Sequence, residues 1–262
     1  MSSTLAFGLV LMLALSFSGV VSTARAYSAS TALTILSGDV MVSHRGGEYF
    51  AAMDGQILSE GDSVKTAADS RAVLTYFEGS TVTIEPSTEL TINSAATLAD
   101  GGTVVVMTQA AGRTWHVVTK LIGGTSKYEV KTPASTASVR GTEFEVNSDA
   151  TSTTVSTTEG TVMAQVDDPS SPGALVEVPV AAGTTQTQAR HAAPSAARAM
   201  PEPARKVTVT VESTNTLVVD PLGRTNGVTP EGKHVVQTPG AQVKRVDGKS
   251  VITLPNLPDG TL

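Results

Sequence analysis

GTEFEV, at residues 141–146, places a glycine and a threonine directly before a strict alternation of glutamate and apolar residues. Glycine tolerates the positive φ of a tight turn, and the small hydroxyl that follows it can hydrogen-bond to local backbone. Because side chains alternate along a strand, Phe144 and Val146 face one way while Glu143 and Glu145 face the other. This hexapeptide therefore predicts a turn followed by a half-buried β-strand.

The same unit recurs through the middle of the chain, and alternating apolar residues follow most of its copies. A Gly-Asp, Gly-Ser or Gly-Thr dipeptide begins, at spacings of 17 to 23 residues, at Gly38, Gly61, Gly79, Gly102, Gly124, Gly141, Gly160 and Gly183. Self-similarity of this kind is typical of stacked repeat architectures. The sequence therefore predicts an all-β, β-solenoid-like fold in which coils of strands stack in one direction.

Composition limits the class of protein. Hydrophobic residues make up 40% of the 262 residues but aromatic residues only 4%, which predicts a core of Val, Leu, Ile and Ala. The net charge of −6 is spread without runs and would not attract a phosphate backbone, so nucleic-acid binding is excluded. The absence of cysteine excludes disulfides, thiolate nucleophiles, cysteine-ligated zinc and a lipid-modified N-terminal cysteine.

The N-terminus has the pattern of an export signal. Residues 5–21 form an apolar run, and Ala24-Arg25-Ala26 fits the A-x-A cleavage rule, with Tyr27 as the first mature residue. No Lys or Arg precedes the run, so an uncleaved N-terminal anchor is the alternative reading of residues 1–26. Either reading predicts an extracytoplasmic protein, periplasmic or secreted.

The remainder divides into two β-rich modules. The glycine-punctuated region covers residues 31–187, and an Ala/Pro/Arg-rich linker, semi-extended and solvent-facing, covers residues 188–205. Residues 206–262 contain short alternating stretches separated by turn formers, which predicts a small β-sandwich. This module is thin for an independent core, and we expect its last strand to be missing or supplied by a partner.

Several strings in the first module resemble the FecR domain, an extracytoplasmic β module of bacterial envelope proteins. The most specific string is KTPASTASVRGTEFEV at residues 131–146. The others stand in the order of the family: LSEGDSVKT (58–66), FEGSTVTIEPSTEL (77–90), TTEGTVMAQV (157–166) and VPVAAGTTQ (178–186). Residues 218–228, 238–242 and 254–261 resemble an immunoglobulin-like accessory module, whose pattern continues into one more strand.

The family signature falls on six residues: Pro133, Arg140, Gly141, Thr142, Glu143 and Phe144. Their expected role is structural, with contact to a partner as a second role. Proline cannot donate to a strand ladder, so Pro133 begins or ends a strand. Arg140 bridges Glu143 or Glu145 or caps exposed carbonyls, and the alternative is that it binds an anionic ligand.

The best-known FecR relatives sense ferric siderophores or ferric citrate through the signalling domain of an outer-membrane transporter and control a sigma factor through a cytoplasmic arm. Only four residues precede the apolar run here, so we expect no such arm. The resemblance therefore implies an exported FecR-domain protein whose sensing role, if present, uses a separate membrane partner.

The sequence offers no catalytic, metal or cofactor residues. The histidines stand apart at His44, His116, His191 and His234, without metal-ligand spacing. A carboxylate pair for glycoside hydrolysis could be drawn from Glu78, Glu85, Glu89, Glu143 and Glu145. Alternating glutamates on a strand more often form a solvated face, and that is our prediction. Trp115 is expected to pack under a coil, with an exposed, sugar-stacking position as the alternative.

We therefore predict a non-enzymatic binding or scaffold module of the bacterial cell envelope, without a cofactor. Its predicted partner is an envelope protein or a cell-wall polymer, and it meets the membrane only through residues 1–26 if these are uncleaved. The alternative is an envelope sensor of the FecR type, which binds the signalling domain of an outer-membrane iron transporter.

Overall fold

The structure is a computed structural model that describes residues 27–171, 173–201, 206–220 and 222–255. The predicted export segment and the expected incomplete C-terminal strand lie outside these residues. The described residues form strands and turns without helices, which confirms the all-β prediction. Accordingly, no helix in these ranges is long and apolar enough to span a bilayer.

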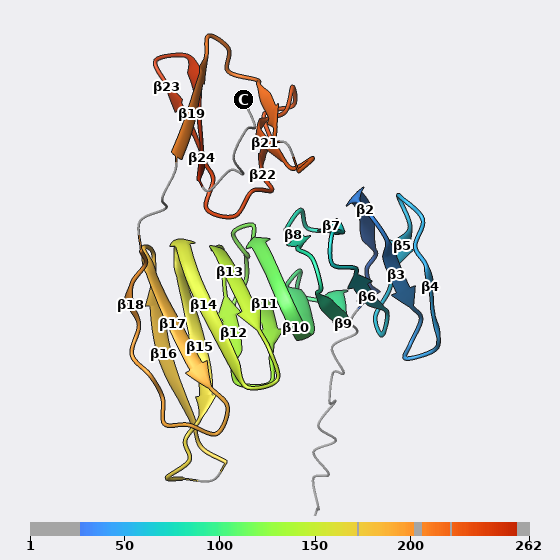
Figure 1. The fold of residues 1–262 in the computed structure, drawn as a ribbon, viewed down its shortest axis with the longest axis vertical. Helices are drawn as coiled ribbons and strands as arrows, with labels where there is room; N and C mark the ends of the chain where they lie inside the picture. Colours follow the sequence, from blue (N-terminus) through green and yellow to red (C-terminus); the bar gives the residue numbers. More distant parts are fainter. Residues whose placement is uncertain (1–26, 172, 202–205, 221, 256–262) are drawn as a thin grey trace, which may run out of the picture.

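Most strands belong to one large mixed sheet that folds over into two layers (Figure 1). The first layer pairs, in spatial order, β4 (Tyr49–Ala51), β3 (Val40–Ser43), β6 (Ser63–Thr66), β9 (Glu89–Thr97), β10 (Thr103–Val117), β11 (Lys127–Lys131), β12 (Thr136–Val139), β15 (Thr161–Asp167) and β16 (Leu175–Ala181), with β1 (Tyr27–Ser28) also on β9. The second layer pairs β5 (Ile57–Leu58), β2 (Thr31–Ser37), β7 (Arg71–Tyr76), β8 (Thr81–Ile84), β10, β13 (Glu143–Ser148), β14 (Ser152–Glu159), β17 (Thr184–Ala189) and β18 (Arg198–Ala199).

Strand direction corrects one prediction. Within the described residues β10 and β11 pair in parallel, and the other pairings are antiparallel. The strands do stack along the sheet, but the expectation of coils stacked in one direction is wrong. Tight glycine turns explain the difference, because hairpins such as β7–β8, which turns at Gly79, return the chain antiparallel to itself.

The long strand β10 joins the two layers at Gly112. It pairs with β9 as far as Ala111 and with β13 from Gly112 onward. Gly112 has φ +93°, and a Cβ atom there would lie 2.4 Å from the Cα of Thr88. Only glycine fits this corner, because both the backbone angle and the space exclude a side chain.

The core between the layers is aliphatic, as the composition predicts, apart from one aromatic group. Inward residues alternate along the strands, for example Phe144 and Val146 on β13 and Val162 and Ala164 on β15. Phe144 stacks on His116 with ring centroids 4.6 Å apart, and Tyr128 packs edge-on against both rings. All members of this cluster are buried.

Residues 190–201 lie along the large sheet. Gln186 and Gln188 are buried, and their side-chain amides donate to Ser195, Ala192 and Ala193. β18 then pairs with β17 before the chain leaves the large sheet. Much of the segment expected as a solvent-facing linker is therefore held against β17 by glutamine side chains.

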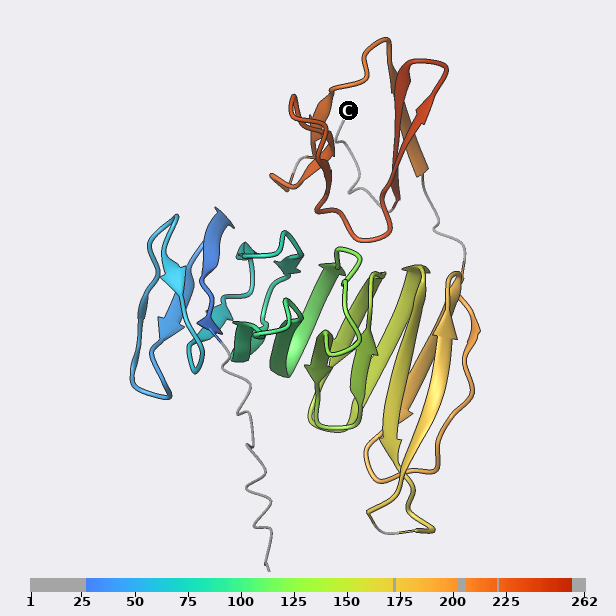
Figure 2. The same cartoon turned by 180° about the vertical axis from the view of Figure 1, so that it is seen from behind.

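The remaining strands form a small module of two three-stranded sheets (Figures 1 and 2). One sheet contains β19 (Lys206–Val211), β24 (Lys249–Pro255) and β23 (Gln242–Val246); the other contains β20 (Leu217–Val219), β21 (Thr225–Val228) and β22 (His234–Val236). Both views place this module at one end of the strands of the large sheet. Two short sheets with a shared core agree with the predicted small sandwich.

Candidate functional site

The two modules meet at Trp115, whose side chain faces outward from the second layer. Trp115 is 2% exposed because it packs into the core of the small module, with Val236, Ala241, Ile252 and Leu254. Its indole nitrogen donates to the carbonyl of Val236 at 3.2 Å. Trp115 is therefore buried as predicted, but beneath the second module instead of beneath a coil of its own.

A second contact between the modules is centred on Glu85, directly after β8. Its carboxylate is 1% exposed and accepts from Arg71 Nε at 2.9 Å and from Arg224 Nη1 at 2.9 Å. Arg113 Nη2 lies 3.7 Å from the same carboxylate. Arg224 belongs to the small module, so this ion cluster joins residues 139 positions apart. The prediction of a solvated face is wrong for Glu85, because the small module covers it.

Hydrogen bonds to Asp220 fix Arg224 in this position. Asp220 accepts from the backbone amides of Leu222 and Arg224 and, through its other oxygen, from Arg224 Nε at 2.6 Å. Thr238 also donates to Asp220 at 2.9 Å. A buried charge is tolerated only when it is paired, and Asp220 and Glu85 each accept a hydrogen bond from the Arg224 guanidinium.

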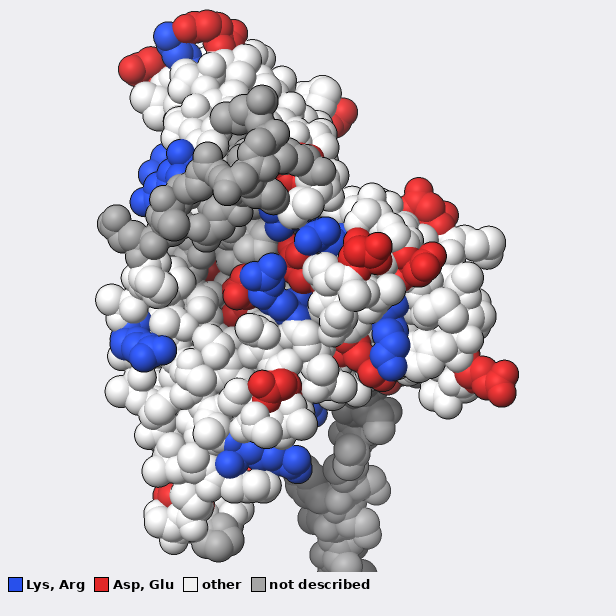
Figure 3. Space-filling model, in the orientation of Figure 1, with Lys and Arg blue, Asp and Glu red and all other residues white. Residues whose placement is uncertain are grey.

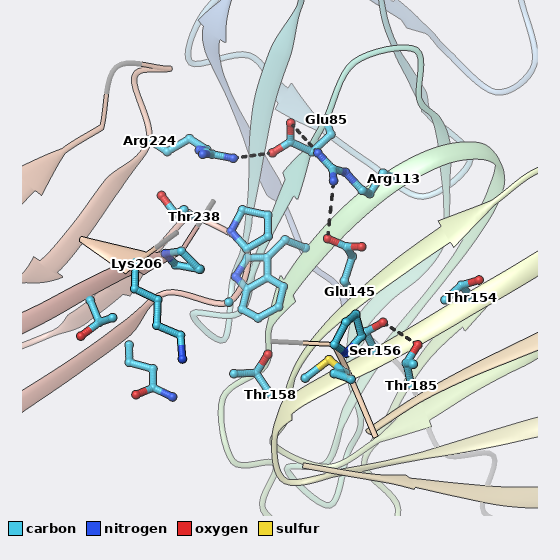
Figure 4. A pocket seen from close by; sticks show the side chains of 18 of the residues that line it. Glu85, Arg113, Glu145, Thr154, Ser156, Thr158, Thr185, Lys206, Arg224 and Thr238 are labelled. Carbon is cyan, nitrogen blue, oxygen red and sulfur yellow. Dashed lines mark hydrogen bonds and ion pairs between the residues drawn. The ribbon is translucent and has the colours of Figure 1, made fainter. Parts of the chain in front are cut away.

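Charged side chains continue along the second layer from Glu85 to Glu145. Arg113 lies between these carboxylates, with Arg113 Nη1 3.9 Å from Glu145 Oε2 (Figure 4). Burial raises the pKa of the Glu145 carboxyl, Arg113 lowers it and the Glu85 charge raises it further. The net effect is a pKa of Glu145 above its ordinary value, with burial as the main cause.

Hydroxyl side chains cover the neighbouring strands β14 and β17. Ser156 and Thr185 are hydrogen-bonded across the strands at 2.8 Å, and Thr154 and Thr187 at 2.9 Å. We call these four residues the hydroxyl floor. Their outward positions follow from strand alternation, since β14 carries Thr and Ser at every second residue.

The ion cluster, the hydroxyl floor and the small module enclose a cavity of about 720 Å³, which we call the junction cavity. Charged atoms of both signs gather at this junction in Figure 3. Lys206 and Thr238 line the cavity from the small module, on the side opposite the hydroxyl floor in Figure 4. Arg198, Met200, Thr158 and Pro239 also contribute to the lining.

The chemistry of the junction cavity suits binding. The described residues of its lining supply hydroxyls, guanidiniums and two carboxylates, but no histidine or cysteine. Among the described residues, no Ser or Thr of the hydroxyl floor is hydrogen-bonded to a base that could activate it. Among the described residues no group of three His, Asp or Glu side chains is arranged to hold a metal ion.

The six signature residues do not line the junction cavity. Arg140 donates to the carbonyl of Gly124 at 2.8 Å, which is the carbonyl-capping alternative. Gly141 has φ +125°, and a Cβ atom there would lie 3.0 Å from Lys120 Cα. Thr142 is buried and donates to the carbonyl of Thr161 at 3.3 Å. Pro133 lies in the turn between β11 and β12.

The last two signature residues lie on opposite sides of β13. Phe144 is in the aromatic core, whereas Glu143 lies beside Glu159 on β14. Burial raises the pKa of Glu143 from 4.5 to about 7, and the charge of Glu159 contributes to the rise. These placements fit a structural role for the signature, and its contact with a partner stays a prediction.

The other singled-out carboxylates and histidines are dispersed. Glu89 pairs with Lys65 at 3.0 Å, and both oxygens of Glu78 are buried without a hydrogen-bond partner among the described residues. The solvated-face prediction is therefore wrong for Glu78 as well. His44 pairs with Asp62 at 3.0 Å. The remaining histidines lie at a turn (His191) and on β22 (His234), apart from His116 in the core.

His116 is held neutral by its surroundings. Thr114 uses its only proton on Gln109 Oε1 at 2.6 Å, so His116 Nε2 must donate to Thr114 at 2.7 Å. His116 Nδ1 then accepts from the Tyr128 hydroxyl at 2.9 Å. Burial lowers the pKa of His116 to about 3. This histidine is a satisfied core residue.

Taken together, the strands and the junction cavity define a two-module all-β protein. Residues 62–163 match the family model described as "FecR protein". The chain therefore carries a domain of the FecR family, and the resemblance drawn from the sequence strings is confirmed. A search of curated proteins returned no match.

Solved structures give a weaker comparison. Two structures of a "putative anti-sigma factor" from Parabacteroides distasonis are similar to this chain, each with a TM-score of 0.42 and 10% sequence identity. The first match covers 74% of this chain and 98% of the solved chain, and the second covers 72% of this chain and 97% of the solved chain. Similarity at this level does not bear on function.

Sequence reasoning singled out Glu85, Glu145 and Trp115 of the junction cavity, but neither the cavity itself nor its arginines. Glu85 lies within one of the strings that resemble the FecR domain, and Arg224 follows residues whose composition indicates a turn. One sequence signal could have indicated a covered surface: Arg113 and Trp115 point outward from a strand that is otherwise rich in small and apolar residues. What covers that strand could not be read from local pattern, because the covering residues are far away in sequence.

Proposed function

We propose that this chain is an exported, non-catalytic binding module of the bacterial cell envelope. Its partner is an envelope protein or a cell-wall polymer, which it recognises at the junction cavity. FecR-family membership supports the assignment, since the family is generally not enzymatic. The export pattern of residues 5–26 supports the location.

One observation carries the proposal: the junction cavity is pre-formed between two modules held together by buried contacts. Trp115 and the Glu85 cluster fix the small module against the second layer. A pre-formed cavity avoids the entropy cost of ordering a site on binding. Its volume of about 720 Å³ falls in the range typical of ligand sites.

Binding is tested with a variant that fills the junction cavity. Thr187 lines the cavity at an exposed position of β17, and Thr34 is an exposed threonine on β2 outside it. Thr187→Trp should lose binding to isolated cell wall or to the protein partner, while Thr34→Trp keeps it. Equal binding by both variants would remove the junction cavity from the proposal.

The second candidate is a sensor of the FecR type, which the family match favours. In that case the partner is the signalling domain of an outer-membrane transporter, and a separate membrane protein relays the signal. Affinity measurements of the full chain against such domains and against isolated cell wall separate the two candidates. Binding to neither would contradict both and leave a purely structural role.

A further inference from the structure

We infer that the junction cavity binds an oligosaccharide that bears several carboxylates, with Arg113 and Lys206 each on one carboxylate and the hydroxyl floor on the sugar hydroxyls. The inference rests on the proposed function, because it names the ligand class of the same cavity. Charge balance, the availability of Arg113, the composition of the hydroxyl floor and the volume of the cavity support it.

The described lining carries more positive than negative groups. Its cations are Arg71, Arg113, Arg198, Arg224 and Lys206, and its anions are Glu85 and Glu145. In the ion cluster, Glu85 lies near three arginines, of which Arg224 is also paired with Asp220, so an excess of positive groups remains in the lining. A low-dielectric cavity with this imbalance attracts an anion more strongly than a solvated surface would.

Arg113 is the arginine of the ion cluster that is available to a ligand. Arg71 and Arg224 donate to Glu85 at 2.9 Å, whereas Arg113 lies 3.7 Å from Glu85 and 3.9 Å from Glu145. Distances of this length are too great for direct hydrogen bonds. The side chain of Arg113 is 45% exposed, against 17% for Arg71 and 6% for Arg224. A bound carboxylate could therefore form the bidentate contact that Arg113 lacks.

The hydroxyl floor favours a sugar over a peptide. The backbone of β14 is paired on one side with β13 and on the other with β17, so a peptide cannot add there as a strand. Hydroxyl side chains both donate and accept, which matches the dual character of sugar hydroxyls. A volume of about 720 Å³ admits a short oligosaccharide and excludes a folded domain.

Calorimetric titration of the full chain with a galacturonic acid tetramer tests the inference, with the fully methyl-esterified tetramer as the neutral match. Poly-L-glutamate serves as the acidic peptide. We expect the acid to bind and its ester to bind at least about tenfold more weakly, where tenfold corresponds to about 1.4 kcal/mol. Added salt should weaken binding of the acid but not of the ester.

Two substitutions assign the contact, and one controls for net charge. Arg113→Gln should weaken binding of the acid about tenfold, which corresponds to about 1.4 kcal/mol. Lys206→Gln, at an exposed position, should independently weaken binding of the acid by the same factor. Arg245→Gln, an exposed position on β23 outside the cavity, should have no effect. Circular dichroism of each variant confirms the fold. Loss of binding in Arg245→Gln, or its retention in both cavity variants, would overturn the assignment.

The remaining outcomes separate this inference from the proposed function. Equal affinity for acid and ester would overturn the charge argument and leave a binding cavity for neutral sugars. Tighter binding of poly-L-glutamate would overturn the sugar argument and favour a peptide partner. If none of the three probes binds but the chain still binds cell wall, only the ligand class is overturned. If the chain binds neither cell wall nor a protein partner, the proposed function is overturned as well.

Discussion

Replacement of Glu85 by glutamine should open the junction between the modules. Glutamine keeps the shape of the side chain, but its amide turns an N–H group toward one of the two guanidiniums that Glu85 contacts at 2.9 Å. Removing one partner of a buried ion pair costs about 3–5 kcal/mol. Asp220 still neutralises Arg224 and Arg113 is partly solvated, so we expect about 3 kcal/mol.

The assay uses Trp115, the single tryptophan of the chain, as a probe placed at the junction. During a urea titration its emission should shift to longer wavelength at lower urea in Glu85→Gln than in the parent protein. Far-UV circular dichroism of the large sheet should change later in the same titration. The variant thereby separates opening of the junction from unfolding of the sheet.

The control is Glu60→Gln, which removes the same charge at an exposed position. Its free energy of unfolding should stay within about 0.5 kcal/mol of the parent value. The reasoning is refuted if Glu85→Gln lowers the free energy reported by Trp115 by less than about 1 kcal/mol. A simultaneous shift of both signals would show instead that Glu85 supports the whole fold.

Three further outcomes follow from the same structure. Trp115→Ala should cost about 3–5 kcal/mol and speed hydrogen exchange in β22 and β24, with unchanged exchange there as the contrary result. Since the folded pKa of Glu143 is raised from 4.5 to about 7, its protonation stabilises the fold below pH 4.5 and that contribution is lost as pH rises through 7. Glu143→Gln should therefore exceed the parent in stability by up to about 3 kcal/mol at pH 8 and match it at pH 4, and identical pH profiles in urea melts would contradict this. Gly112→Ala should prevent the β10 corner and fail to give a cooperative thermal transition, whereas Gly46→Ala, at an open turn, should keep one.

Local pattern predicts the strands well because alternation is a property of each strand alone. Phe144 and Val146 are inward and Glu143 and Glu145 outward, as the opening hexapeptide indicates. Most of the predicted turn glycines have positive φ; at Gly102 and Gly124 the preceding glycine takes that role. Strand direction could not be predicted, because it depends on which distant strand each one meets.

The candidate site escaped prediction for a related reason. Alternation correctly turns Glu85 out of the large sheet, and an outward carboxylate is ordinarily solvated. Its burial depends on Arg224, 139 residues later, and on the rest of the small module. The composition of residues 220–224 indicates a turn but contains no information about the surface on which that turn lies.

The shared core at Trp115 sets an order of folding. The hydrophobic core of the large sheet draws all its members from strands and turns up to residue 197, whereas the core of the small module includes Trp115. The large sheet can therefore fold first, and residues 206–255 assemble on it as a template through contacts of high sequence separation. A ligand that binds only the assembled junction stabilises this last step by mass action. For such a ligand, binding and folding of the small module are one coupled equilibrium.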